Sequence, residues 1–144
     1  MAKSTQSPID QAVALLQRWQ EVENAGVAQT TQIISKTQNP LVKLLMEIIR
    51  HDSIMHHRVQ QFMIESMTTK TITLTPEELA EVWTLIEEHI RLEKETIGLG
   101  DELKKVTKLF VQSELLAYLY ADESKHDMLL ERLEQFKRKL YPYA

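Results

Sequence analysis

The chain has 144 residues, with 17 basic and 21 acidic side chains and no cysteine. This length suits one domain with a sizeable core, and the absence of cysteine excludes disulfides and thiolate metal sites. A net charge of −4 with well-mixed signs argues against nucleic acid as a partner. No apolar run is long enough to span a membrane, and the first residues lack the apolar stretch of a signal peptide. We therefore expect a cytoplasmic protein with no membrane partner.

The composition favours helices throughout the chain. Only three glycines and four prolines interrupt a sequence rich in Leu, Glu, Lys, Gln and Met, all of which are good helix formers. We predict an all-α fold, an antiparallel four-helix bundle that forms a single domain over residues 1–144. Caps, breakers and apolar periodicity place the four helices at about 8–35, 41–67, 76–105 and 108–140.

The helix ends carry clear signals. Ser7 before Pro8, and Thr75 before Pro76, each combine a capping side chain with a proline at the first helical position. Pro142 is expected to stop the last helix. The threonine-rich residues 68–75 alternate in β-branched character and should be extended.

The expected inner faces are apolar stripes at helical spacing. In chain order they contain Ile9, Val13, Leu16, Trp19, Val27, Ile34, Leu41, Leu45, Ile48, Val59, Phe62, Met63, Leu79, Val82, Leu85, Ile86, Leu92, Leu115, Leu116, Leu119, Leu129, Leu133 and Phe136.

Polar residues interrupt these stripes at one level of each helix. At an offset of 70 residues, Glu23 matches Glu93 and His56 matches His126. Residues equally far from a hairpin turn lie at equal depth, so all four helices should bring their polar residues to one level, within about 5 Å. Buried carboxylates and imidazoles are costly unless something compensates them, and a shared metal ion is one such compensation.

The sequence therefore predicts a metal site in the interior of the bundle. The candidate ligands are Glu23, His56, Glu93, Glu123 and His126, with His89 as a further candidate. Mixed carboxylate and imidazole ligands suit iron or manganese, one or two ions, and possibly zinc. Asp52 and Asp122 precede His56 and His126 by one turn, and each is expected to accept the ring N–H of its histidine.

The segments 39–57 and 115–130 resemble the second and fourth helices of ferritin-like, rubrerythrin-type proteins, where an apolar helix carries Asp-Glu-x-x-His followed by leucines. The resemblance implies a dinuclear iron or manganese carboxylate centre. Glu123 and His126 match the fourth-helix pair, and His56 matches the second-helix histidine. Ser53 stands where that family has a glutamate. Glu23 and Glu93 occupy the places of the first- and third-helix carboxylates.

A second resemblance stays open beside the first. The spacing His89-x-x-x-Glu93 is similar to that of the second helix of hemerythrin-like domains, which hold a di-iron site. An eight-residue linker reaches about 30 Å, whereas a crossover along the bundle needs about 40 Å. The linker therefore favours an up-down-up-down bundle, the topology of the hemerythrin-like alternative.

Two functions follow from these patterns. The first is a metal-binding protein that handles oxygen, peroxide or iron, and the sequence leaves open whether it is an enzyme. The second is a non-catalytic homo-oligomeric module, expected to be a dimer, whose metal site is degenerate or empty. Trp83 and the methionine-rich stretch 55–67 would then supply the interface.

Overall fold

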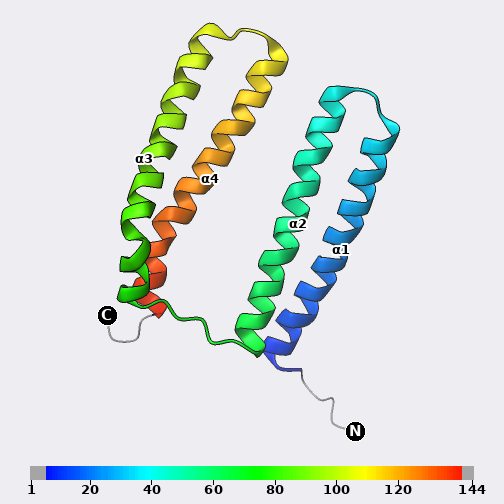
Figure 1. Cartoon of the computed structure of the whole chain (residues 1–144). Coiled ribbons are helices and arrows are strands. Elements are labelled where there is room, and N and C mark those ends of the chain that lie inside the picture. Colours follow the sequence, from blue (N-terminus) through cyan, green and yellow to red (C-terminus); the bar gives the residue numbers. More distant parts are fainter. Residues whose placement is uncertain (1–5, 141–144) are drawn as a thin grey trace. The chain divides into compact units, whose positions relative to one another are not determined.

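A computed structural model describes residues 6–140. The chain forms two compact units, Met1–Thr71 and Ile72–Ala144. Each unit is one helical hairpin (Figure 1). Hairpin 1 contains α1 (Pro8–Lys36) and α2 (Pro40–Thr68); hairpin 2 contains α3 (Pro76–Val106) and α4 (Phe110–Leu140).

The described residues contain four helices and no strand, which confirms the predicted all-α class. Each helix begins and ends within about two residues of its predicted position, a usual uncertainty for helix ends. The assembly of both hairpins into one ferritin-like bundle stays a prediction. Between residues 6 and 140, no helix has both the length and the apolar composition that crossing a membrane requires.

The predicted caps are present. The side chains of Ser7 and Asp10 form a capping box at the start of α1, and those of Thr75 and Glu78 form another at the start of α3. The carboxamide of Asn39 accepts hydrogen bonds from the first backbone N–H groups of α2. These contacts satisfy donors that a helix start leaves without partners. The stop expected at Pro142 lies outside the described residues.

The two helices of each hairpin lie side by side and run in opposite directions (Figure 1). In hairpin 1, Gln20 bonds Gln61 near the open end, and Arg50 bonds Thr31 nearer the turn. In hairpin 2, Tyr120 donates to Asp101 at 2.7 Å on the turn side of the middle. Three-residue loops join the helices in both hairpins.

The stripe through which two helices of a hairpin contact each other is called the seam below. Its residues recur at alternating spacings of three and four, as in a coiled coil. In α1 it includes Val13, Leu16, Gln20, Glu23, Val27, Thr30 and Ile34. In α2 it includes Met46, Arg50, Ser53, His57, Gln60, Ile64 and Met67. Hairpin 1 therefore buries several polar side chains along its seam.

Most of the residues expected on the inner faces are exposed on their hairpins. These residues are Ile9, Trp19, Leu41, Leu45, Val59, Phe62, Met63, Val82, Leu85, Leu92, Leu119, Leu129 and Phe136. These exposed side chains lie beside the seam, so the neighbouring helix of the same hairpin does not cover them, whereas other predicted inner-face residues, such as Leu16 and Val27, lie on the seam. Leu16, Ile64, Leu79 and Leu116 are the buried apolar residues of the described chain.

The two hairpins repeat each other at an offset of 70 residues. The first helix of each ends at Lys36 and Val106, and the second begins at Pro40 and Phe110. The seam keeps the same register, since Glu23 and Glu93 are both buried seam residues. The repeat seen in the sequence is therefore a repeat of structure.

Two glycines in α3 provide a matched test of this packing. A Cβ added at Gly98 meets no atom within 4 Å, whereas one added at Gly100 lies 3.1 Å from the Tyr120 ring. Gly98→Ala should stabilise hairpin 2 by about 0.5–1 kcal/mol, because alanine loses less backbone entropy in a helix. Gly100→Ala should gain less or destabilise, because it displaces Tyr120. Urea unfolding of both variants measures the difference, and equal gains would show that Tyr120 does not pack on Gly100.

Candidate metal centre

Glu93 is the most deeply buried carboxylate of the candidate site. It lies in the seam of α3, and its side chain is 7% exposed. The seam register places it there, two heptads after Leu79, which is buried in the same stripe. When the carboxyl groups of Glu93 and Glu123 are both ionised, Oε2 of Glu93 is buried without a hydrogen-bond partner. Such a group is costly, so a proton or a cation is expected beside it.

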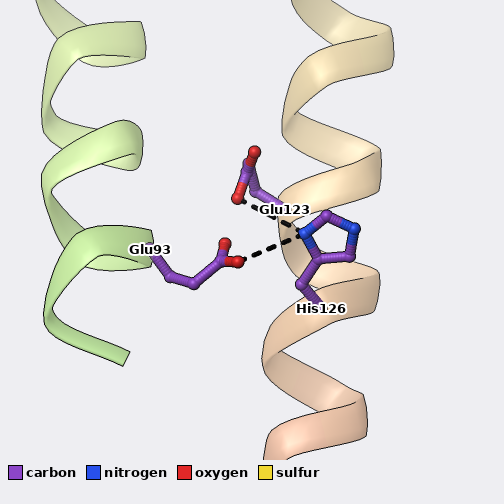
Figure 2. A group of neighbouring side chains, drawn as sticks. All are labelled: Glu93, Glu123 and His126. Carbon is purple, nitrogen blue, oxygen red and sulfur yellow. Dashed lines mark ion pairs between the residues drawn. The ribbon is translucent and has the colours of Figure 1, made fainter. Parts of the chain in front are cut away.

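Two residues of α4 meet Glu93 across the seam (Figure 2). His126 Nδ1 lies 3.3 Å from Glu93 Oε1 and 3.7 Å from Glu123 Oε2. One ligand atom from each residue falls within 4.8 Å of the other two. Glu123 and His126 are three residues apart, so they share a helix face. The structure thus brings together three of the six predicted ligands.

His89 is a neighbour of this group on α3. Its Nε2 lies 2.8 Å from Glu93 Oε1, one helical turn away, as the i, i+4 spacing predicts. The ring is more than half exposed, whereas the carboxylate is buried. His89 can therefore hold Glu93 in place or, after a rotation, contribute a second imidazole.

The carboxyl groups of Glu93 and Glu123 interact, and the pKa values of the two shift in opposite directions. Their hydrogen bond raises the pKa of Glu123, and burial together with the negative charge of Glu93 adds to this effect. The same bond is the main cause of the lowered pKa of Glu93. Burial raises this pKa, whereas the hydrogen bond and charge of His89 and the charge of His126 lower it further. Glu93 is therefore the ionised partner, and Glu123 retains the proton to a higher pH than an ordinary glutamic acid.

The residues of this group are of the types that could hold a transition-metal ion. Ligand atoms about 2.0–2.2 Å from one ion lie up to about 4.4 Å apart, and both distances from His126 Nδ1 fall within that limit. Two carboxylates and one imidazole would leave coordination positions for water, His89 or a small substrate. Binding would require Glu123 to release its proton and His126 to present the lone pair of Nδ1.

The expected role of Asp122 is wrong. Its carboxylate pairs with Lys125 at 2.8 Å and accepts a hydrogen bond from Tyr118, instead of accepting one from the ring of His126. The bond from Lys125 is the main cause of its lowered pKa. Lys125 follows Asp122 by three residues, a spacing that brings the flexible ammonium to the same face. Asp52 likewise makes no hydrogen bond to His56 within the described residues.

Hairpin 1 brings together two further predicted ligands. Glu23 is buried in the seam of α1, and its Oε1 lies 3.4 Å from His56 Nδ1. Ser53 is also buried, three residues before His56, and a Cβ added at Gly26 would lie 3.5 Å from its hydroxyl. That this pair and the Glu93 group form one shared site stays a prediction.

Buried amides are the polar feature that the sequence patterns missed. Gln20 and Gln60 lie in the seam of hairpin 1, and Gln20 donates to the side chain of Gln61 and the carbonyl of His57. Counting in alternating steps of three and four would have placed both in the seam, because Gln20 precedes Glu23 by three residues on α1 and Gln60 follows Ser53 by seven on α2.

Comparison with protein-family models, curated proteins and solved structures found no match to this chain.

The shared proton gives a test in metal-free protein. A raised folded pKa means that the native state holds the Glu123 proton more tightly, so this contribution is present at low pH. It is lost as pH rises from the ordinary value of 4.5 through the higher native value. Glu123→Gln keeps a donor to Glu93 without a titratable proton, so it should remove this part of the pH dependence.

Urea unfolding between about pH 4 and about pH 8 with chelator present measures the effect. Wild type should lose stability relative to Glu123→Gln across this range. Glu123→Ala, which lacks a donor, should be the least stable of the three near pH 4. A constant difference between wild type and Glu123→Gln would show that no proton is shared.

Proposed function

We propose that hairpin 2 binds a divalent transition metal through Glu93, Glu123 and His126. The observation that carries the proposal is the buried Glu93 carboxylate. Its Oε2 has no hydrogen-bond partner when Glu93 and Glu123 are both ionised. A cation would occupy the position where two carboxylates and an imidazole converge. It would replace the shared proton and neutralise both acids.

The ligand types favour iron or manganese, with zinc as a further candidate. Imidazole and carboxylate together suit these ions better than calcium or magnesium, which prefer oxygen ligands alone. A bound iron or manganese would supply Lewis-acid and redox chemistry toward oxygen or peroxide. Glu93 would bind the ion from the buried side of the site, and the partly exposed His126 would bind it from the side that is open to solvent.

The same proposal places the chain among ferritin-like metal-carboxylate proteins. Its support is the all-α fold of four long helices, the Glu-x-x-His spacing of Glu123 and His126 on α4, and a buried glutamate from the preceding helix. Hemerythrin-like chemistry remains the alternative that uses His89 and Glu93 on α3.

One observation favours a second candidate, a non-catalytic homodimeric module. Each hairpin exposes large apolar side chains beside its seam, among them Leu15, Trp19 and Val22 on α1 and Leu85, Leu99 and Leu119 on the helices of hairpin 2. Exposed apolar stripes of this kind mark interaction surfaces. In this case the glutamate pair would keep its proton and bind no metal.

Metal analysis with matched variants separates the two candidates. Protein purified without chelator should contain stoichiometric iron or manganese. Glu93→Ala, Glu123→Ala and His126→Ala should each weaken Mn²⁺ binding at least about 100-fold, since changes to groups that only orient a ligand already cost about 10–100-fold. Titration calorimetry and elemental analysis give both quantities.

The controls are Glu95→Ala on α3 and His51→Ala on α2, two exposed residues outside the group. Both should bind Mn²⁺ as wild type does. If metal-free wild-type protein binds none of added iron, manganese and zinc, the proposed metal site is wrong. Light scattering that then shows a dimer would support the module instead.

A further inference from the structure

We infer that hairpin 2 binds a small organic cation in a groove between α3 and α4, with Trp83 at its centre. Two cavities of about 460 Å³ and about 390 Å³ form this groove, and Trp83 and Glu134 line both of them. Each cavity has the size of a small-molecule cleft. The groove contains none of the three proposed metal ligands, so the inference goes beyond the proposed function and does not rest on it.

The groove lies on the polar side of hairpin 2. Along α3, helical spacing places Trp83, Ile90 and Lys94 on one side of Glu93. The same spacing places the exposed leucines of this helix on the other side of Glu93, namely Leu85, Leu92 and Leu99. A layer that packs on those leucines would therefore leave the groove open to a ligand.

The larger cavity combines apolar side chains with an excess of negative charge. Besides Trp83, its lining consists of Ile90, Lys94, Asp127, Leu130, Glu131 and Glu134. Glu134 lies 3.7 Å from Arg138, whereas Asp127 and Glu131 have no ion pair among the described residues. Carboxylates beside an aromatic face favour an organic cation, because they neutralise its charge while its apolar part contacts the ring.

The indole ring of Trp83 is held in one orientation. Its Nε1 donates to Glu87 Oε1 at 2.9 Å, one turn further along α3, and the side chain is half-buried. This hydrogen bond uses the single polar atom of the ring and leaves the π faces for a ligand. A cation over such a face binds about 2- to 30-fold more tightly than a neutral group of the same shape.

Hairpin 1 is bridged at the corresponding place. There Gln20 donates across the seam to Gln61 at 3.0 Å. The residues 70 later are Ile90 and Glu131, which line the larger cavity. Isoleucine has no side-chain donor for a carboxylate, so hairpin 2 lacks this bridge. The groove therefore occurs where the two repeats differ in the residues that join their helices.

The experiment follows the fluorescence of Trp83 in the Trp19→Phe protein, in which Trp83 is the single tryptophan. Chelator keeps the protein metal-free, so the outcome does not depend on the proposed metal site. Three probes share one benzyl group, namely benzyltrimethylammonium, benzyl alcohol and phenylacetate. The cation should bind at least about 5-fold more tightly than the alcohol, and the anion should bind most weakly. Equal affinities for cation and alcohol, tighter binding of phenylacetate, or unchanged fluorescence with every probe would each overturn the inference.

Charge variants locate the bound cation. Asp127→Asn and Glu131→Gln should each weaken the binding of benzyltrimethylammonium about 2- to 5-fold, because each removes one negative charge. Lys94→Gln should strengthen binding by a similar factor, because it removes the ammonium group from the lining. Glu95→Gln, on α3 outside the groove, is the control and should bind the cation as the parent protein does.

Titration calorimetry tests the ring and the missing bridge. Trp83→Leu should weaken binding of the cation at least about 3-fold. Ile90→Gln combined with Glu131→Gln gives hairpin 2 the bridge of hairpin 1, and should weaken binding more than Glu131→Gln alone. If Trp83→Leu is folded by circular dichroism and binds benzyltrimethylammonium as tightly as its parent, the groove is not the binding site and the inference is wrong.

Discussion

The burial of the Glu93 carboxylate in the seam of hairpin 2 is the constraint on which the site depends. A negative charge in that position is costly without compensation. The side chains around Glu93 each contribute part of this compensation. His89 and His126 approach one oxygen, and Glu123 contributes a proton. A proton lies at this place in the metal-free protein, and the proposed cation would take the same position. A metal ion would exchange with the proton of Glu123 rather than enter an empty cavity.

The repeat explains why a similar group occurs in both hairpins, and the seam explains why the two groups differ. Hairpin 1 buries a row of polar side chains, and Gly26 lies close to the small Ser53 at the level of the Glu23–His56 pair. In hairpin 2 the corresponding residues are Thr96 and Glu123. The exchange of Ser53 for Glu123 is the difference that turns a Glu–His pair in hairpin 1 into a Glu–Glu–His group in hairpin 2.

The apolar stripes show what a helical pattern leaves open. Leu119, Leu129 and Phe136 recur at helical spacing and were expected in contact with neighbouring helices, yet they are exposed on hairpin 2. The contact within hairpin 2 runs through the seam, which carries Glu123 and also Leu116, a residue that the apolar pattern did include. Amphipathic periodicity identifies a wide apolar face, but it does not decide which edge of that face the first neighbouring helix covers. Those exposed residues stay available for a further layer of packing.

The sequence by itself determined the helices, their caps and their pairing into hairpins, because these depend on local signals such as Ser7–Pro8 and Thr75–Pro76 and on short loops. It also located Glu93, Glu123 and His126 at one depth, since equal distance from a turn fixes the level of a residue in an antiparallel pair. Only the tertiary structure decided which rotations bury Glu93 and Glu23, and that Asp122 pairs with Lys125. The register of a seam and the choice between competing partners depend on side chains from two helices at once, which no single stretch of sequence specifies.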